Sequence, residues 1–318
     1  MDQLLQTNQR RKLKRVGLFV GLALIAAAFW TIARSGTIVN QAWQHLSVAS
    51  PILFAELLGC IALIALCTAL SVLILSNRTR PPIRVELREM LALICASTLG
   101  NFVPLQPGLI GRIAFHHQVH GIAVPISLLI AIQSTALTGI AALWIGAGLA
   151  FTHATHLSWS AAVLSPILLV PFLRNTAARE FTAAFFIRIV ETCIWALRIH
   201  IAFQLIGQPI DAAAALAMAC VANAANTIPF IGNGIGIREW SVGFLAPMIA
   251  GVPLADALAA EIVGRLAEII FFIPAGLAAW PMLHKRLRVR RATRVVQTSA
   301  EELDGSLANI IREHNHEK

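Results

Sequence analysis

The sequence contains little charge and no tyrosine. Charged residues make up 13% of its 318 residues, whereas hydrophobic residues make up 57%. Several apolar runs exceed the roughly 18 residues that mark a membrane-spanning helix. The composition therefore excludes an ordinary soluble protein and predicts an all-α polytopic integral membrane protein.

The sequence also lacks the motifs of the common enzyme and metal-site classes. Its five cysteines are not arranged as Cys-x-x-Cys pairs, so neither a disulfide framework nor a zinc site follows from them. There is no Ser-His-Asp order, no GxxxxGK[ST] phosphate-binding loop and no pair of catalytic carboxylates. We therefore expect no enzymatic activity, no cofactor and no bound metal. Any directional transport would draw on lipid gradients, ions, the membrane potential or a partner.

Positive charge is concentrated near the two ends of the chain. The net charge is +9, and 11 of the 25 lysines and arginines lie in segments 10–15 and 284–294. Both clusters flank apolar spans, and basic clusters in that position favour the cytoplasmic side and contact with anionic lipid headgroups. Nucleic-acid binding needs a basic face with aromatic or groove-reading elements, so we expect no nucleic-acid partner.

The charges of the loops predict the order of the crossings. The loop at 77–89 carries four arginines against one basic residue in the loop at 34–51, which places the later loop in the cytoplasm. Counting from there predicts about six full crossings with both termini inside. Residues 1–15 form a basic N-terminus, 16–283 a single transmembrane domain, and 284–318 a basic and then polar cytoplasmic tail. The polar part after Arg294 is expected to be flexible or marginally helical.

Two apolar segments interrupted by Gly and Pro share a phrase. NFVPLQPGLIG at 101–111 and NTIPFIGNGIG at 226–236 match at four positions in register, although chance in a biased composition is the alternative. Paired interruptions of this kind indicate a transporter-type binding site at the bilayer midplane. We expect two re-entrant segments, near 90–125 and 212–253, related as an inverted repeat. The residues expected at their breaks are Asn101, Pro104, Gly108, Gly111, Asn226, Pro229, Gly232, Gly234 and Gly236.

Ionisable residues lie deep within the apolar sequence. Each costs at least ~2.5 kcal/mol at the centre of a membrane helix, so such residues face a protein interior or a wet cavity and pair there. Glu261, Arg265 and Glu268 are spaced to share one helical face, and Arg188 and Glu191 form a stripe on another span. Ion pairs that fix helix packing are one interpretation, and an arginine available to a lipid phosphate is the other. The expected substrate-contacting residues are Arg112, Arg188, Glu191, Arg238, Glu239, Glu261, Arg265 and Glu268.

Other polar residues are expected nearer the surface. Arg198, on the same face as Arg188, is expected either to pair or to extend outward to the interface. His116, His117 and His120 are expected to be solvated at the interface. The four-residue spacing of His116 and His120 could hold a metal, but no Glu stands between them as hydrolytic zinc sites require.

A Pro-x4-Gly-x-Gly-h-Arg-Glu element, where h is hydrophobic, stands out in the second half. Its residues are Pro229, Gly234, Gly236, Arg238 and Glu239, and Arg265, Glu268, Pro274 and Gly276 follow it. Together these residues resemble the lysylphosphatidylglycerol synthase transmembrane-region family, a flippase-like membrane domain, over roughly residues 86–283.

In the first half the same family has a Pro-Gly-x-x-Gly-[Glu/Asp] phrase, which Pro107, Gly108 and Gly111 match. This chain departs from the phrase at Arg112, where an acidic residue is usual. It departs again at 133–134, where Gln and Ser stand in place of a frequent Arg.

The resemblance implies a protein of the bacterial cytoplasmic (inner) membrane that moves a phospholipid or lipid-linked headgroup between leaflets. Its partners would be membrane lipids, anionic or zwitterionic phospholipids among them. About 35 residues follow Leu283, so we expect no aminoacyl-transferase domain and no lysyl transfer. The alternatives are an integral-membrane enzyme and an accessory subunit of glycolipid or hopanoid synthesis in contact with lipid-synthesis enzymes. A homodimer also remains open.

Overall fold

The computed structural model describes residues 50–77, 85–102, 107–174, 178–227 and 236–316, with a few positions between 23 and 44. Over these residues the protein is all-α, with nine α-helices and one 3-10 helix. Among them, three helices are long and apolar enough to cross a membrane, and two shorter ones are apolar. The long candidates are Pro51–Ser76, Val124–Ala154 and Leu254–Arg290, and the shorter ones are Ser160–Phe172 and Ala212–Asn226.

The expected all-α membrane class is therefore confirmed. Some expectations fall outside the described residues: most of the first span after residue 15, and four of the residues at the breaks, Pro104, Pro229, Gly232 and Gly234.

Helix α3 (Pro51–Ser76) shows how a span is delimited. Ser50 caps its start, because the Ser50 hydroxyl accepts a hydrogen bond from the Ile52 N–H at 3.2 Å, and Pro51 occupies the first turn, where no backbone donor is needed. Its 26 residues give a length of about 39 Å at 1.5 Å per residue. That exceeds the roughly 30 Å of a bilayer's hydrocarbon core.

Two helical hairpins occupy the segments that share the repeated phrase. The first pairs α4 (Leu87–Asn101) with α5 (Pro107–His120), and the second pairs α9 (Ala212–Asn226) with α10 (Ile237–Ile249). Arms of 13 to 15 residues are about 20 to 22 Å long, so none of them could span a bilayer alone. The first arms end at Asn101 and Asn226, the two asparagines that open the repeated phrase.

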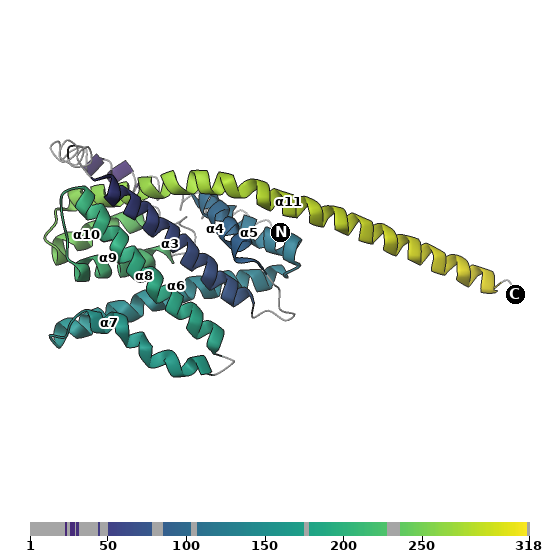
Figure 1. Cartoon of the computed structure of the whole chain (residues 1–318), viewed down its shortest axis with the longest axis horizontal. Coiled ribbons are helices and arrows are strands. Elements are labelled where there is room, and N and C mark those ends of the chain that lie inside the picture. Colours follow the sequence, from purple (N-terminus) through teal and green to yellow (C-terminus); the bar gives the residue numbers. More distant parts are fainter. Residues whose placement is uncertain are drawn as a thin grey trace, which may run out of the picture.

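The hairpins belong to two sets of four helices with the same order. The first set is α3, α4, α5 and α6 (Val124–Ala154), and the second is α8 (Arg179–Leu205), α9, α10 and α11 (Leu254–His316). Helices α3 and α8 pack against each other, α4 packs against α11, and α9 packs against α6, so each set contacts the other in matching pairs. Figure 1 shows α3 and α8 running in opposite directions.

The segment between the two sets is irregular. Helix α7 (Ser160–Leu164) continues into the 3-10 helix Ser165–Arg174, which contains Pro166 and Pro171. Proline lacks a backbone donor and clashes with the preceding turn, which disfavours a regular α-helix over this segment. This apolar segment is therefore a short α-helix joined to a 3-10 helix.

Helix α11 extends beyond the bundle. It continues through the basic cluster to His316 and so includes the segment after Arg294, which was expected to be flexible or marginally helical. No Gly or Pro interrupts the chain between Pro281 and Gly305, and Arg, Leu, Ala and Glu in this stretch favour the helix. Figure 1 shows this part of α11 leaving the bundle.

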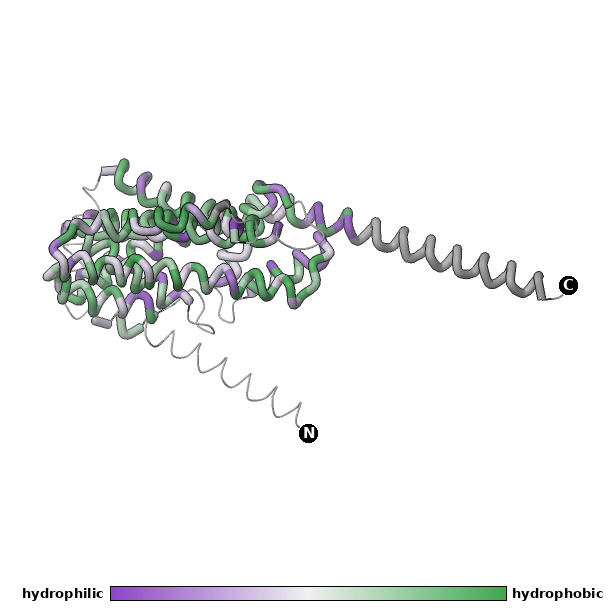
Figure 2. Tube along the Cα trace, turned by 90° about the horizontal axis from the view of Figure 1, so that it is seen from below, coloured by the Kyte–Doolittle hydropathy of each residue, from purple (hydrophilic) through white to green (hydrophobic). Residues whose placement is uncertain are grey.

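The bundle buries apolar side chains inside and exposes others outside. Leu57, Met218 and Phe203 are fully buried at the centre, whereas Leu143 on α6 and Trp280 on α11 are largely exposed. Figure 2 shows a mainly hydrophobic bundle and a hydrophilic stretch of α11 where that helix leaves it. Such an apolar outer surface suits contact with lipid chains.

Candidate functional site

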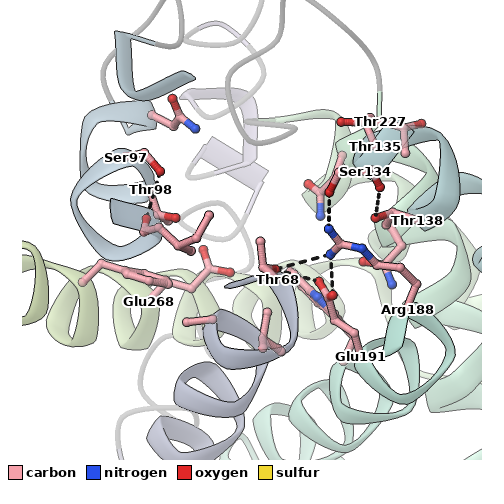
Figure 3. A pocket seen from close by; sticks show the side chains of 18 of the residues that line it. Thr68, Ser97, Thr98, Ser134, Thr135, Thr138, Arg188, Glu191, Thr227 and Glu268 are labelled. Atoms are coloured by element: carbon pink, nitrogen blue, oxygen red, sulfur yellow. Dashed lines mark hydrogen bonds and ion pairs between the residues drawn. The ribbon is translucent and has the colours of Figure 1, made fainter. Parts of the chain in front are cut away.

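A cavity of about 240 Å³ lies among the helices of the two sets. Its wall carries four arginines and two glutamates, together with hydroxyl and amide side chains. Figure 3 shows Ser97 and Thr98 of α4 on one side and Ser134, Thr135 and Thr138 of α6 on another. The charged residues that line it are Arg112, Arg188, Glu191, Arg238, Arg265 and Glu268.

The first charged cluster surrounds Arg188 on α8. Its guanidinium donates to Glu191 one turn along the same helix, to the Ser134 hydroxyl on α6 and to the Thr68 hydroxyl on α3. Thr68 in turn donates to Glu191 Oε1 at 3.2 Å. The hydrogen bonds drawn in Figure 3 therefore join three helices through one buried ion pair.

The second cluster surrounds Arg238 in the first turn of α10. Its Nε donates to Glu261 Oε2 at 3.1 Å and its Nη1 donates to Glu268 Oε1 at 3.0 Å, while Nη2 lies 3.8 Å from Glu239 Oε1. The Arg238 side chain is only 1% exposed. A guanidinium enclosed by three carboxylates has its charge matched within the protein.

Glu268 on α11 is shared by three guanidinium groups. Besides Arg238, it accepts hydrogen bonds from Arg198 Nη1 on α8 at 2.5 Å and from Arg265 Nη1 at 3.1 Å. The Arg198 guanidinium also lies over the Trp195 ring, 4.4 Å from its centroid. Arg198 is therefore a member of this cluster and does not extend to the interface.

Glu239 ties the second hairpin to α11. Its Oε2 accepts a hydrogen bond from the Gly236 N–H at 2.7 Å, and its Oε1 accepts from Arg265 Nε at 2.8 Å. Gly236 has φ of 84°, a backbone conformation that favours glycine, and it is the residue directly before α10. The start of α10 is thus held by the charged cluster.

Arg112 on α5 differs from the other arginines. It lines the cavity but forms no ion pair or hydrogen bond with another described residue. The undescribed segments between residues 78 and 235 contain no acidic residue that could serve as its partner. With every group ionised, the set of charged residues in and next to the cavity carries one positive charge in excess. It comprises Arg112, Arg188, Arg198, Arg238, Arg265, Glu191, Glu239, Glu261 and Glu268, of which Arg112 and Arg265 are only partly buried.

The residues expected at the first break have different roles. Asn101 Oδ1 accepts a hydrogen bond from the Leu109 N–H at 3.1 Å, which closes the turn between α4 and α5. Gly108 lies inside α5, where a Cβ would stand 1.7 Å from the Ser97 carbonyl oxygen, so glycine there allows the two arms to touch. Gly111 also lies inside α5, with open space around it. Both glycines lie within α5, which begins at Pro107.

The second break places an amide at the cavity. Asn226, the last residue of α9, lines the cavity, and its Oδ1 is buried without a hydrogen-bond partner among the described residues. Asn223, one turn earlier, donates to the Thr192 hydroxyl at 3.2 Å. Asn226 therefore presents an unsatisfied polar atom at the site.

Two of the three clustered histidines are buried, which corrects the expectation that they are solvated. His116 is 4% exposed, and the His120 side chain is 8% exposed. The reason is that α4 and α11 pack over this face of α5. His117 is exposed. In the described part of the chain no three His, Cys, Asp or Glu residues are placed to hold a metal.

The eight residues expected to contact substrate lie in or next to one cavity. Sequence reasoning missed Thr68, Ser134, Asn226 and Trp195 as members of the polar wall, although Asn226 was expected at a break. Serine and threonine are common in membrane helices, so the sequence carried no signal for the first two. Trp195 lies at helical spacing from Arg188 and Glu191, which was the available signal.

Comparison of the chain with protein families, with curated proteins and with solved structures found no match. The fold and the apolar helices define the class, an all-α membrane protein with several candidate spans. The resemblance to the lysylphosphatidylglycerol synthase transmembrane region rests on the sequence motifs alone.

Proposed function

We propose that this protein moves an anionic phospholipid, or a lipid-linked anionic headgroup, between the two leaflets of a membrane. The observation that carries this proposal is the set of charged residues around the cavity, in which Arg112 has no carboxylate partner among the described residues. A phosphodiester carries one negative charge, which matches the one positive charge in excess. Guanidinium groups bind phosphate oxygens through two parallel hydrogen bonds.

The cavity size supports a headgroup rather than a whole lipid. Its volume of about 240 Å³ is below the roughly 300 to 1,000 Å³ of sites that enclose a drug-sized ligand. The acyl chains would therefore stay in the bilayer while the headgroup passes through the polar site. Hydroxyl groups of α4 and α6, and the unsatisfied Asn226 Oδ1, would contact the polar part of the headgroup.

The arrangement of the two helix sets supports movement between leaflets. Their matching order, the similar lengths of the first three helices of each set and the opposite directions of α3 and α8 suit an inverted repeat, in which the two hairpins enter from opposite leaflets. Inverted repeats with a midplane site suit alternating access, because one set can rock against the other. In this proposal the long helices cross fully, the hairpins re-enter, and the basic end of α11 is cytoplasmic.

Reconstitution into vesicles tests the proposal. Purified protein would be placed in phosphatidylcholine vesicles containing fluorescent phosphatidylglycerol, and the lipid reaching the outer leaflet would be measured by dithionite quenching. We expect movement above the rate of empty vesicles. Arg112→Gln is expected to slow it about 10- to 100-fold, because a charge-assisted hydrogen bond contributes about 1.5–3 kcal/mol.

Arg179→Gln is the matched control, since Arg179 pairs with Glu180 on the surface and is 62% exposed. The control is expected to behave as wild type. Movement at the empty-vesicle rate for phosphatidylglycerol and for zwitterionic lipids would contradict the proposal. Recovery of a chemically altered lipid would favour the enzyme alternative instead.

A further inference from the structure

A chain of titratable side chains leads away from the cavity along one face of α5. Arg112, His116 and His120 are spaced by four residues, so they share that face. The two histidine rings approach with their Nδ1 atoms 3.3 Å apart, and His120 Nε2 lies 3.4 Å from Glu89 Oε1 on α4. Glu89 Oε2 lies 3.9 Å from Arg286 on α11, whose side chain is 50% exposed. The contacts therefore run from a cavity residue to Glu89, which lies beside a half-exposed arginine.

We propose that His116, His120 and Glu89 form a proton relay that couples a proton to the anion in the cavity, so that lipid and proton move together. This inference rests on the proposed function, because the anion is the headgroup assigned to the Arg112 site. It adds the coupling ion, which the sequence did not identify.

The contacts allow a set of proton positions that suits a relay. If His116 Nδ1–H donates to His120 Nδ1, the proton of neutral His120 is on Nε2 and faces Glu89. The unprotonated nitrogen of the chain is then His116 Nε2. A proton accepted there releases the Nδ1 proton to His120, which releases its Nε2 proton to Glu89. One proton enters at His116 Nε2 and one ends on Glu89, and the reverse sequence carries a proton inward from Glu89.

The surrounding charges explain why the anion and the proton would bind together. Arg112 stands one helical turn from His116, so a proton on His116 is repelled by the guanidinium unless an anion neutralises it. Glu89 faces the histidines from α4, and Arg286 faces Glu89 from α11. Helix α6 also packs against α5 but carries no Asp, Glu, Lys or Arg, and its only histidine lies near its far end. Coupling between two such ligands is typically about 5- to 150-fold.

The test measures lipid and proton movement in the same vesicles. The phosphatidylglycerol vesicles described above would also contain a pH-sensitive dye, with and without an imposed pH gradient. We expect the gradient to change the rate of lipid movement at least about fivefold, with a matching pH change inside. His116→Gln and Glu89→Gln are expected to move lipid at a rate that no longer responds to the gradient. His117→Gln is the control, because His117 is exposed and its ring contacts the Ile122 carbonyl.

The outcomes separate the two proposals. If the wild type moves lipid at one rate with and without the gradient, and no pH change follows, the proton relay is wrong and the translocase proposal stands. If no lipid moves, the translocase proposal is wrong, and proton uptake on adding dihexanoyl-phosphatidylglycerol to detergent-solubilised protein decides the relay. Proton uptake that His116→Gln abolishes and His117→Gln retains would support the relay. Equal uptake by the wild type and His116→Gln, or no uptake by the wild type, would overturn it.

Discussion

Substitution of Glu268 by glutamine is predicted to destabilise the bundle more than any surface charge change. Glu268 accepts hydrogen bonds from Arg198, Arg238 and Arg265, and its side chain is only 9% exposed. Glutamine has almost the same shape but no charge, so the substitution leaves three buried guanidinium groups with two carboxylates. The loss of stability in this variant therefore measures charge matching rather than packing.

The expected loss of stability follows from the burial of Glu268. Removing one partner of a buried ion pair costs about 3–5 kcal/mol, a large part of the roughly 5–15 kcal/mol that holds a typical protein folded. For a chain of this size that corresponds to a Tm lower by roughly 6–20 °C, at about 2–4 °C per kcal/mol. Glu86→Gln is the matched control, because Glu86 pairs with Arg286 at the surface and both side chains are at least half exposed. Its effect is expected to be below about 1 kcal/mol.

A thiol-reactive dye provides the assay. The five cysteines are free and all but Cys193 are buried, so they react with the dye only when the bundle opens on heating. The double variant Glu268→Gln/Arg198→Gln restores equal numbers of both charges and is expected to recover part of the lost Tm. A Glu268→Gln protein that melts within about 2 °C of wild type would refute the reasoning. A double variant whose Tm falls by the sum of the two single-variant losses would refute the reasoning as well.

Two further predictions concern the first hairpin. Gly108→Ala would put a Cβ 1.7 Å from the Ser97 carbonyl oxygen, and overpacking of this kind costs about 1–3 kcal/mol. Gly111→Ala in the same helix is the control, because its Cβ meets no atom within 4 Å. This variant is expected to leave the Tm equal or higher. Equal losses for both glycine variants in the dye assay would contradict the close approach of α4 and α5. Asn101→Ala removes the acceptor of the Leu109 N–H and is expected to cost about 1 kcal/mol, while Asn101→Asp keeps an acceptor and most of the stability. Equal melting of both Asn101 variants would rule out this hydrogen bond as the cause.

The positions of the two breaks could be predicted from the sequence because they depend on local chemistry. Asn, Pro and Gly interrupt a helix wherever they cluster, and α4 and α9 do end at Asn101 and Asn226. The shared face of Glu261, Arg265 and Glu268 was also predictable, since it follows from helical spacing, and all three meet at one cluster.

Partners and burial were less predictable because they depend on segments far apart in the chain. Nothing in the sequence near Arg198 indicates that it donates a hydrogen bond to Glu268, 70 residues later. His116 and His120 were expected to be solvated, but α11 covers them from more than 130 residues away. In a membrane protein the outer surface is as apolar as the core, so hydrophobic periodicity does not indicate which face of a helix is buried.

The arginines of the site divide by whether the protein itself matches their charge. Arg238 is enclosed by carboxylates and so is suited to holding α10 and α11 together, although the sequence suggested it as a phosphate contact. Arg112, which is only partly buried, has no such partner among the described residues, and an unmatched charge removed from water lowers stability. Arg112→Gln is therefore predicted to leave the Tm equal or higher in the dye assay while it slows lipid movement. Glu268→Gln is predicted to lower both. If Arg112→Gln lowers the Tm as much as Glu268→Gln does, Arg112 has a structural partner and the anion site must be sought elsewhere in the cavity.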